Sequence, residues 1–176
     1  MPAEIIGCEL VTHPPLRFVG KRFDAYPDWS QAWVNGWFDI IEQTSEIAFI
    51  NDDSYCVLRG NANGSDVYYL GEFCVEGSKV PAGLDYADLS ASSAAIAYIK
   101  GKIEEVYALT ADNNKPTLLA AFADSGIEFP ADAISAASTT TDPEPRWLSF
   151  ERDNCPRFTD PDAQGNVILD FAVYLS

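Results

Sequence analysis

Apolar and β-branched residues recur in short runs along this chain, and turn-forming residues separate the runs, a pattern typical of paired β-strands. The runs at 55–60 and 67–75 flank Asn63-Gly64, a dipeptide that favours two-residue hairpin turns. The runs at 146–158 and 167–176 flank the polar segment "TDPDAQGN". The pattern therefore predicts one hairpin in the middle of the chain and one at its end.

Two further segments, at residues 8–20 and 84–101, have the composition of extended chain interrupted by a bend. Pro14-Pro15 interrupts the first, because proline has no N–H to donate to a neighbouring strand. A run of small residues at 90–93 interrupts the second. We expect each segment to be extended on both sides of its bend.

Spacings of three and four residues predict helices in two places. Asp28 can cap a first helix at about residues 29–43, although Gly36 weakens it. The residues that give it this period are Trp29, Trp33, Trp37, Ile40 and Ile41. A second helix at 116–125 starts at a proline and stops near a glycine. Residues 102–114, which lie between the second bent segment and this helix, are ambiguous and fit a helical turn and a loop.

The order strand, helix, strand, strand therefore occurs twice. We predict an α+β fold of two βαββ units, with pseudo-repeats at about 4–80 and 81–176 in a single domain that covers residues 1–176. The strands are expected to join in an antiparallel-rich sheet, with two main helices covering one of its faces.

The composition fits one packed domain, with 176 residues of which 47% are hydrophobic and 12% aromatic. No apolar run could span a bilayer, and the N-terminus lacks a basic segment followed by an apolar one, so we expect a cytoplasmic protein with no membrane partner. A net charge of −16 without clustered Lys and Arg argues against direct binding of nucleic acid. The acidity could attract a cationic ligand, or it could serve only to keep the protein in solution.

Metal and triad chemistry have little support. The four cysteines, Cys8, Cys56, Cys74 and Cys155, form no CxxC pair, and His13 is the one histidine. We expect reduced thiols, no metal site and no cofactor. The sequence also identifies no catalytic residue.

Glu151 interrupts the predicted strand "WLSFERDNCPRF" at a position where an apolar residue is expected. Strict alternation places Trp147, Ser149 and Glu151 on one face of this strand. Two interpretations stay open. Glu151 could be a strand-end carboxylate that is paired with an arginine or hydrated. It could also be a buried anion in an aromatic pocket, where a cationic ligand would offset the cost of burial and cation–π attraction would assist.

The aromatic residues leave a similar choice. The tryptophans on the first helix form one slowly rotating stripe, which is either helix core or the wall of a ligand site. Tyr68 and Tyr69 point to opposite faces of their strand, so only one of them can face the helices.

Four stretches resemble the GyrI-like effector-binding domains, which include the ligand domains of AraC- and MerR-type transcription regulators and free-standing relatives. The stretches are "WLSFERDNCPRFTDPDAQGNVILDFAVYL", "YYLGEFCV", "KVPAG" and "IAYIKGKIEEVY". The similarity extends from about residue 8 to the end of the chain. It implies a duplicated βαββ fold with a central cleft between its halves.

The resemblance also implies that Glu151 lies in this cleft among aromatic rings and faces lipophilic, often cationic, ligands. By the same matching, Trp33 and Tyr69 line the pocket. The family's tyrosine two residues after the glutamate is Asp153 here, which could add a second negative charge. The full set of candidate ligand-binding residues is Glu151, Trp33, Tyr69, Trp147, Trp37, Tyr98 and Phe171.

Three functions follow as hypotheses. The first is a small-molecule (multidrug) binding module for hydrophobic, cationic aromatic compounds, whose role in transcription regulation would need a separate DNA-binding chain because no helix-turn-helix precedes it. The second is a hydrolase of strained electrophilic compounds that uses Glu151 as base or nucleophile. The third is a protein-interaction module. A second carboxylate or a tyrosine within hydrogen-bond reach of Glu151 would favour chemistry, and a single glutamate enclosed by rings would favour binding. The sequence leaves the oligomeric state open.

Overall fold

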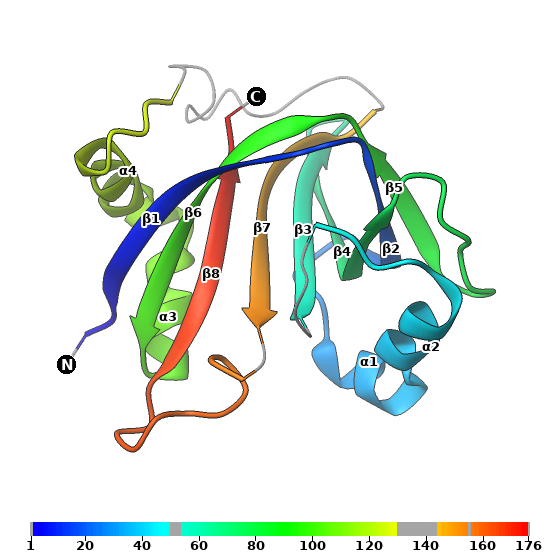
Figure 1. Cartoon of the computed structure of the whole chain (residues 1–176), viewed down its shortest axis with the longest axis horizontal. Helices are drawn as coiled ribbons and strands as arrows, with labels where there is room; N and C mark the ends of the chain where they lie inside the picture. The colour runs from blue at the N-terminus through cyan, green and yellow to red at the C-terminus, as the bar shows by residue number, and fades with distance from the viewer. Residues whose placement is uncertain (1, 50–53, 130–143, 155, 176) are drawn as a thin grey trace.

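The computed structural model describes residues 2–49, 54–129, 144–154 and 156–175. Eight strands form one sheet in the order β1-β6-β8-β7-β3-β4-β2-β5, and every neighbouring pair is antiparallel (Figure 1). The strands are β1 Glu4–His13, β2 Leu16–Phe23, β3 Ser54–Ala62, β4 Ser65–Val75, β5 Asp85–Leu89, β6 Ser92–Gly101, β7 Arg146–Asn154 and β8 Val167–Tyr174.

The two segments predicted to be extended on both sides of a bend are the pairs β1–β2 and β5–β6. They run antiparallel to each other on both sides of the bend, since His13 pairs with Ser92 before it and Leu16 pairs with Leu89 after it. Pro14-Pro15 lies at the bend of the first segment. As a result β1 and β5 form the two edges of the sheet. Each bent segment has one strand near one edge of the sheet and its other strand near the opposite edge.

The element order repeats in the two halves of the chain, and β3 and β7 meet at the centre of the sheet. When each bent segment is counted as one strand, each half is a βαββ unit. The predicted α+β fold is therefore confirmed. The division of the single domain into pseudo-repeats near residue 80 is our proposal, and this order supports it.

Both predicted hairpins form. The turn between β3 and β4 has positive φ at Asn63 (51°) and Gly64 (76°), as a type I′ turn requires. The closing hairpin joins β7 to β8, which pair only from Ser149 to Arg152. The short pairing leaves the lower part of β7 separate from β8 (Figure 1).

The helices differ from the prediction in number. The structure has α1 Trp29–Asn35, α2 Trp37–Thr44, α3 Ile103–Thr110 and α4 Lys115–Asp124, with a 3-10 turn, η1 Asp112–Asn114, before α4. The single helix predicted at 29–43 is two helices, because Gly36 has a φ of 63°, which ends the first helix. The ambiguous segment at 102–114 holds α3, so four helices replace the two main ones.

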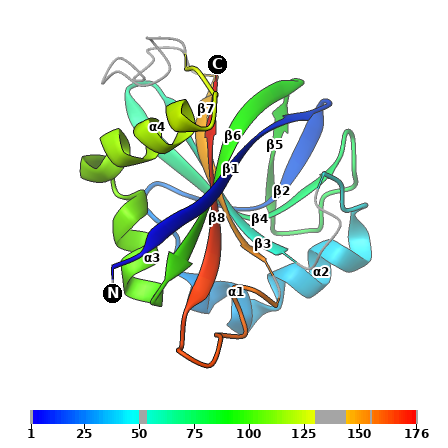
Figure 2. The same ribbon diagram turned by 60° about the vertical axis from the view of Figure 1, so that its left-hand side comes forward.

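All four helices pack on the same face of the sheet, with α1 and α2 on one half and α3 and α4 on the other (Figure 2). The opposite face has its own core, formed by side chains from all eight strands together with Ala48 and Phe49. The sheet bends to close over this core (Figure 1). The central strands β3 and β7 are thus free to carry a site on the helical face, between the two helix pairs.

Two smaller observations complete the fold. None of the helices in the described ranges is long and apolar enough to cross a membrane. The thiols of Cys8, Cys56 and Cys74 are free, while Cys155 lies outside the described residues.

Candidate functional site

A cavity of about 580 Å³ opens on the helical face of the sheet, over the central strands. Its walls come from both halves of the chain: the segment before α1 and α1 itself on one side, and the end of α3 on the other. The lining residues are Tyr26, Trp29, Val57, Arg59, Asp66, Tyr68, Tyr107, Thr110, Ala111, Asp112, Ser149, Glu151 and Phe171. Five aromatic side chains and several charged groups therefore surround one open volume.

Glu151 lies at the floor of this cavity. It pairs with Val57 in the central β3–β7 ladder, and it is only 5% exposed. The Tyr26 hydroxyl donates a hydrogen bond to Glu151 Oε1, and Trp29 Nε1 donates to the Tyr26 oxygen at 3.3 Å. Burial raises the pKa of Glu151 to about 7, although the bond from Tyr26 opposes this rise.

A second carboxylate lies two residues further along β7. Asp153 is 4% exposed, and the Tyr107 hydroxyl of α3 donates to its Oδ2 at 3.2 Å. Burial, and then the charge of Glu151, raise the pKa of Asp153 to about 8. The site thus holds two coupled carboxyl groups, and each half of the chain supplies one tyrosine donor, Tyr26 or Tyr107.

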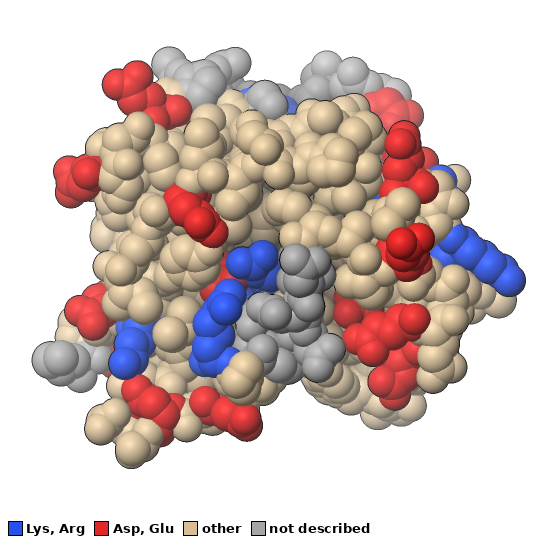
Figure 3. All heavy atoms as spheres, viewed as in Figure 1, with Lys and Arg blue, Asp and Glu red and all other residues tan. Residues whose placement is uncertain are grey.

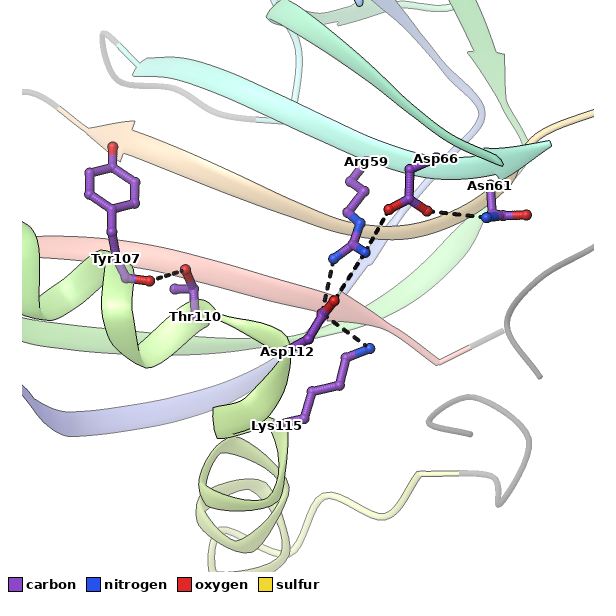
Figure 4. Close-up of polar contacts among 7 residues, drawn as sticks. All are labelled: Arg59, Asn61, Asp66, Tyr107, Thr110, Asp112 and Lys115. Carbon is purple, nitrogen blue, oxygen red and sulfur yellow. Dashed lines mark hydrogen bonds and ion pairs between the residues drawn. The ribbon is translucent and has the colours of Figure 1, made fainter. Parts of the chain in front are cut away.

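Charged side chains form one rim of the cavity (Figure 4). Arg59 lies between two carboxylates, with Nη2 at 2.8 Å from Asp66 and Nη1 at 3.1 Å from Asp112. Lys115 approaches Asp112 to 3.6 Å from the other side. The guanidinium of Arg59 also lies 5.9 Å from the ring centre of Tyr68. Because the arginine is already engaged by two acidic groups, the rim as a whole does not attract an anion.

Two of the sequence-predicted residues, Glu151 and Phe171, line the cavity. Asp153, which the sequence marked as a possible second negative charge, lies next to Glu151 on the same face of β7. The interpretation of Glu151 as a strand-end carboxylate paired with an arginine does not fit its burial. Arg152 and Arg157 instead form ion pairs with Asp170.

Trp147 does not lie on the face that strict alternation predicted. The register of β3 and β7 shifts between Arg59, which pairs with Ser149, and Gly60, which pairs with Trp147. The extra residue turns Trp147 to the opposite face of the sheet. There its ring covers Gly60, where an added Cβ would lie only 2.8 Å from the indole.

Tyr69 lies on that same opposite face, 5.9 Å from the Trp147 ring between centroids, and belongs to the core without helices. Its neighbour Tyr68 is the tyrosine of β4 that lines the cavity. Tyr98 is also outside the cavity, with its hydroxyl bonded to Glu9 and the Arg157 guanidinium 5.8 Å from its ring. Side-chain alternation along a regular strand explains these positions.

The other two tryptophans also lie outside the cavity. Trp33 is 55% exposed and packs its edge against Tyr55, 5.0 Å away between centroids. The ring of Trp37 packs near that of Phe23, with 6.2 Å between their centroids. The tryptophan of this helix pair that does reach the cavity is Trp29. The structure thus does not bring Trp33, Tyr69 and Trp147 together at one cavity, and their role in ligand binding stays a prediction.

Sequence reasoning missed four aromatic residues of the cavity: Tyr26, Trp29, Tyr68 and Tyr107. Tyr26 precedes α1 in a segment without regular period, so no pattern fixes its direction. Tyr107 lies on α3, which the sequence left ambiguous. For Trp29, the helical stripe contained the signal, but the rest of the stripe does not reach the cavity: Trp33 on the same helix is exposed, and Gly36 ends α1 before Trp37.

The comparisons with known proteins identify the fold, which is the one expected of GyrI-like effector-binding domains. Neither the family models nor the curated proteins that were searched match the chain. Among solved structures, the C-terminal domain of EcmrR has a TM-score of 0.53 at 13% identity, covering 97% of each chain.

Two other solved structures have the same fold. The structure of SAV2435 bound to tetraphenylphosphonium has a TM-score of 0.53 at 11% identity, covering 97% of this chain and 94% of that one. A proposed bacterial transcription regulation protein from Staphylococcus aureus has a TM-score of 0.51 at 12% identity, covering 97% of this chain and 98% of that one. At these identities the similarity shows the fold alone.

Proposed function

We propose that this protein is a small-molecule binding module that takes up hydrophobic, cationic aromatic compounds in the cavity, with Glu151 as the counter-charge. One observation carries the proposal: a buried carboxylate forms the floor of an open cavity walled by aromatic rings. Among the described residues, no basic side chain forms an ion pair with Glu151. The Glu151 carboxylate is therefore available to pair with a cation from outside the chain.

The physical argument concerns the cost of burying the charge. An ionised carboxylate in this surrounding has lost most of its hydration, which is why the pKa of Glu151 rises to about 7. A cation in the cavity would offset this loss through direct attraction. The rings of Tyr26, Trp29, Tyr68 and Tyr107 would add apolar contact and cation–π attraction to the same ligand.

Structural similarity gives independent support. SAV2435, which has the same fold, has been solved with tetraphenylphosphonium, a bulky aromatic cation. The acidic composition is consistent with a cationic small molecule as the partner and with no direct contact to nucleic acid. Figure 3 shows acidic side chains scattered over one face of the molecule, with only small groups of basic ones between them.

The hydrolase hypothesis has in its favour the Tyr26 hydroxyl, which donates a hydrogen bond to Glu151, and the second buried carboxylate, Asp153, next to it. We propose that this tyrosine positions the carboxylate instead of taking part in chemistry. A phenol that donates to the carboxylate reduces its nucleophilicity, and burial together with the charge of Glu151 raises the pKa of Tyr26 so that it stays a neutral donor. The solved structures with this fold give the hydrolase no support.

Titration calorimetry with tetraphenylphosphonium and with tetraphenylborate tests the proposal. The two ions have nearly the same shape and opposite charge. We expect saturable binding of one cation per chain and no binding of the anion, because the anion would meet the buried carboxylates. Equal binding of the two ions, or no binding of the cation, would contradict the proposal. Recovery of an altered ligand after incubation would instead favour the hydrolase.

Replacement of two tryptophans separates the cavity from the rest of the aromatic surface. We expect Trp29→Ala to weaken phosphonium binding by about 1 kcal/mol or more, the range for loss of an aromatic contact with a cation. Trp33→Ala should leave the affinity within about twofold, because Trp33 lies outside the cavity. Calorimetry on both variants checks this, and a larger loss in Trp33→Ala would favour the original sequence-based placement of the site.

A further inference from the structure

A second, smaller cavity adjoins the first beneath α4. Its volume is about 30 Å³, and its inner wall is apolar: Leu118 and Leu119 from α4, Leu148 from β7, and Val173 from β8. The two cavities share Arg59, Thr110, Asp112, Ser149 and Phe171 in their walls. They are therefore neighbouring volumes with a common boundary.

The ion pair between Arg59 and Asp112 lies in this common boundary, and Figure 4 shows it next to the start of α4. Each partner has a second ionic contact. Arg59 also binds Asp66 at 2.8 Å, and Asp112 also binds Lys115 at 3.6 Å. If Arg59 and Asp112 separate, each charge keeps one partner of opposite sign.

Separation of this pair is therefore energetically easy. The Asp112 side chain is 62% exposed and can move into water, while the Arg59 side chain, which is 23% exposed, keeps its bond to Asp66. The cost is therefore close to the small one of an exposed ion pair. Asp112 also belongs to a 3-10 turn of three residues, so the movement does not disturb a long helix. The apolar wall behind the pair has no comparable freedom, since Leu118 is only 1% exposed and packs in the core under α4.

We propose that the small cavity is a subsite for an apolar tail of the ligand, and that the Arg59–Asp112 ion pair acts as the gate between this subsite and the main cavity. The proposal rests on the proposed function, because the tail belongs to a cation whose charge lies at Glu151. It names the ligand class more closely as amphiphilic cations: a bulky cationic head with a flexible hydrocarbon chain.

The apolar lining supports a hydrocarbon occupant. Apart from the five boundary residues, the one charged side chain of its lining is Lys115, which is paired with Asp112; the other lining residues are apolar, so a polar tail would lose its hydration and gain few new partners. The bulge in β7 contributes directly, because it turns Leu148 toward the same side as Ser149 and thus adds a third leucine to the wall. Because the closed cavity holds only about 30 Å³ and its apolar wall is fixed, a longer chain needs the space that the Arg59 and Asp112 side chains vacate when they separate.

A series of alkyltriphenylphosphonium ions with methyl, butyl, hexyl and octyl chains tests the proposal by calorimetry. The head and the charge stay constant while only the tail changes. We expect affinity to increase by up to about fourfold for each added methylene that enters the subsite, and then to reach a plateau. A flat series in the wild-type protein would overturn the subsite.

Two variants locate the tail. Leu119→Phe and Leu148→Phe each fill the small cavity from a different element, and both residues are only partly buried, so thermal melts can confirm that the variants fold. We expect both to bind the methyl compound as the wild-type protein does and to lose most of the gain with chain length. Val34→Phe, at an exposed position on α1, is the matched control and should keep the gain.

The outcomes are distinguishable. If the methyl compound itself does not bind, the proposed function fails, and the subsite fails with it. If the methyl compound binds and both filled variants keep the full gain with chain length, the tail lies elsewhere and only the subsite is overturned. Asp112→Asn adds a test of the gate: we expect it to speed the association of the octyl compound in stopped-flow measurements, and an unchanged rate would contradict the gate.

Discussion

Replacement of Glu151 with glutamine should weaken the binding of methyltriphenylphosphonium by about 1–3 kcal/mol, roughly 5- to 150-fold. Glutamine keeps the size of the side chain and its ability to accept a hydrogen bond from Tyr26, but it removes the charge. Because Glu151 is buried at the floor of the cavity, its charge acts on the ligand with little screening by water. Calorimetry measures the change directly.

A neutral ligand of similar shape is the control for this experiment. Triphenylphosphine oxide should lose much less affinity than the phosphonium ion in Glu151→Gln. Glu76→Gln, which removes one negative charge from an exposed position, should change the binding of neither compound by more than about twofold. Equal losses for the cation and the oxide would mean that Glu151 contributes shape and hydrogen bonding but does not distinguish charge.

The same carboxylate predicts how cation binding depends on pH. The pKa of Glu151 in the empty cavity is about 7, and only the ionised form attracts the cation. Affinity should therefore be highest above pH 8 and decrease below pH 7, approaching tenfold for each pH unit while one proton is exchanged. In Glu151→Gln the dependence on pH should be weaker over this range.

The second large effect concerns stability. We expect the free energy of unfolding to decrease by about 3 kcal/mol or more as the pH rises from about 5 to about 8. Burial raises the pKa of Glu151 from 4.5 to about 7 and is the main reason that the pKa of Asp153 rises from 3.8 to about 8. For Glu151 alone the difference is about 2.5 pH units, and each unit corresponds to about 1.36 kcal/mol.

The direction follows from proton binding. Between the pKa values of the unfolded and folded chain, the folded protein keeps a proton on each carboxyl group that the unfolded chain has released. Stability is therefore greatest at low pH within this window and is lost as the folded groups ionise. Chemical denaturation at several pH values measures this dependence.

Asp153→Asn is the informative variant for stability. It keeps an oxygen that can accept from Tyr107 and removes the charge, so we expect it to be more stable than the wild-type protein at pH 8.5, with a difference that becomes smaller as the pH falls toward the unfolded pKa of 3.8. Asp124→Asn, at an exposed site, controls for the change in net charge. A wild-type stability that stays constant or increases between pH 6 and pH 8 would contradict the buried state of the two carboxyl groups.

Local patterns in the sequence were sufficient to predict most of the fold. Asn63-Gly64 and Pro14-Pro15 each determine a turn or a bend through their own backbone chemistry, without help from distant residues. The helix at 116–125 has its start and stop residues within its own sequence. By contrast, α3 follows Lys102, which is not a typical N-cap residue, and only the structure shows that Glu105 accepts a hydrogen bond from the Lys102 N–H and that the helix packs against β6 and β8.

The site was less predictable, because it depends on contacts between distant parts of the chain. Glu151 was predicted as an anomaly in a strand, and burial supports that interpretation. The placement of Trp147 failed because one extra residue in β7 reverses the alternation, and the sequence carries no glycine or proline there to indicate a bulge. Tyr26 lies 125 residues from the carboxylate that it binds, so only the folded structure shows the pair.

The bent segments β1–β2 and β5–β6 determine how the two halves depend on each other. β1 belongs to the first half but pairs only with β6 of the second, and β5 belongs to the second half but pairs only with β2 of the first. Neither half could therefore complete its own sheet if the chain were cut near residue 80. The same geometry provides a route to domain swapping, in which two copies of the chain exchange halves and keep every strand pairing and both walls of the cavity.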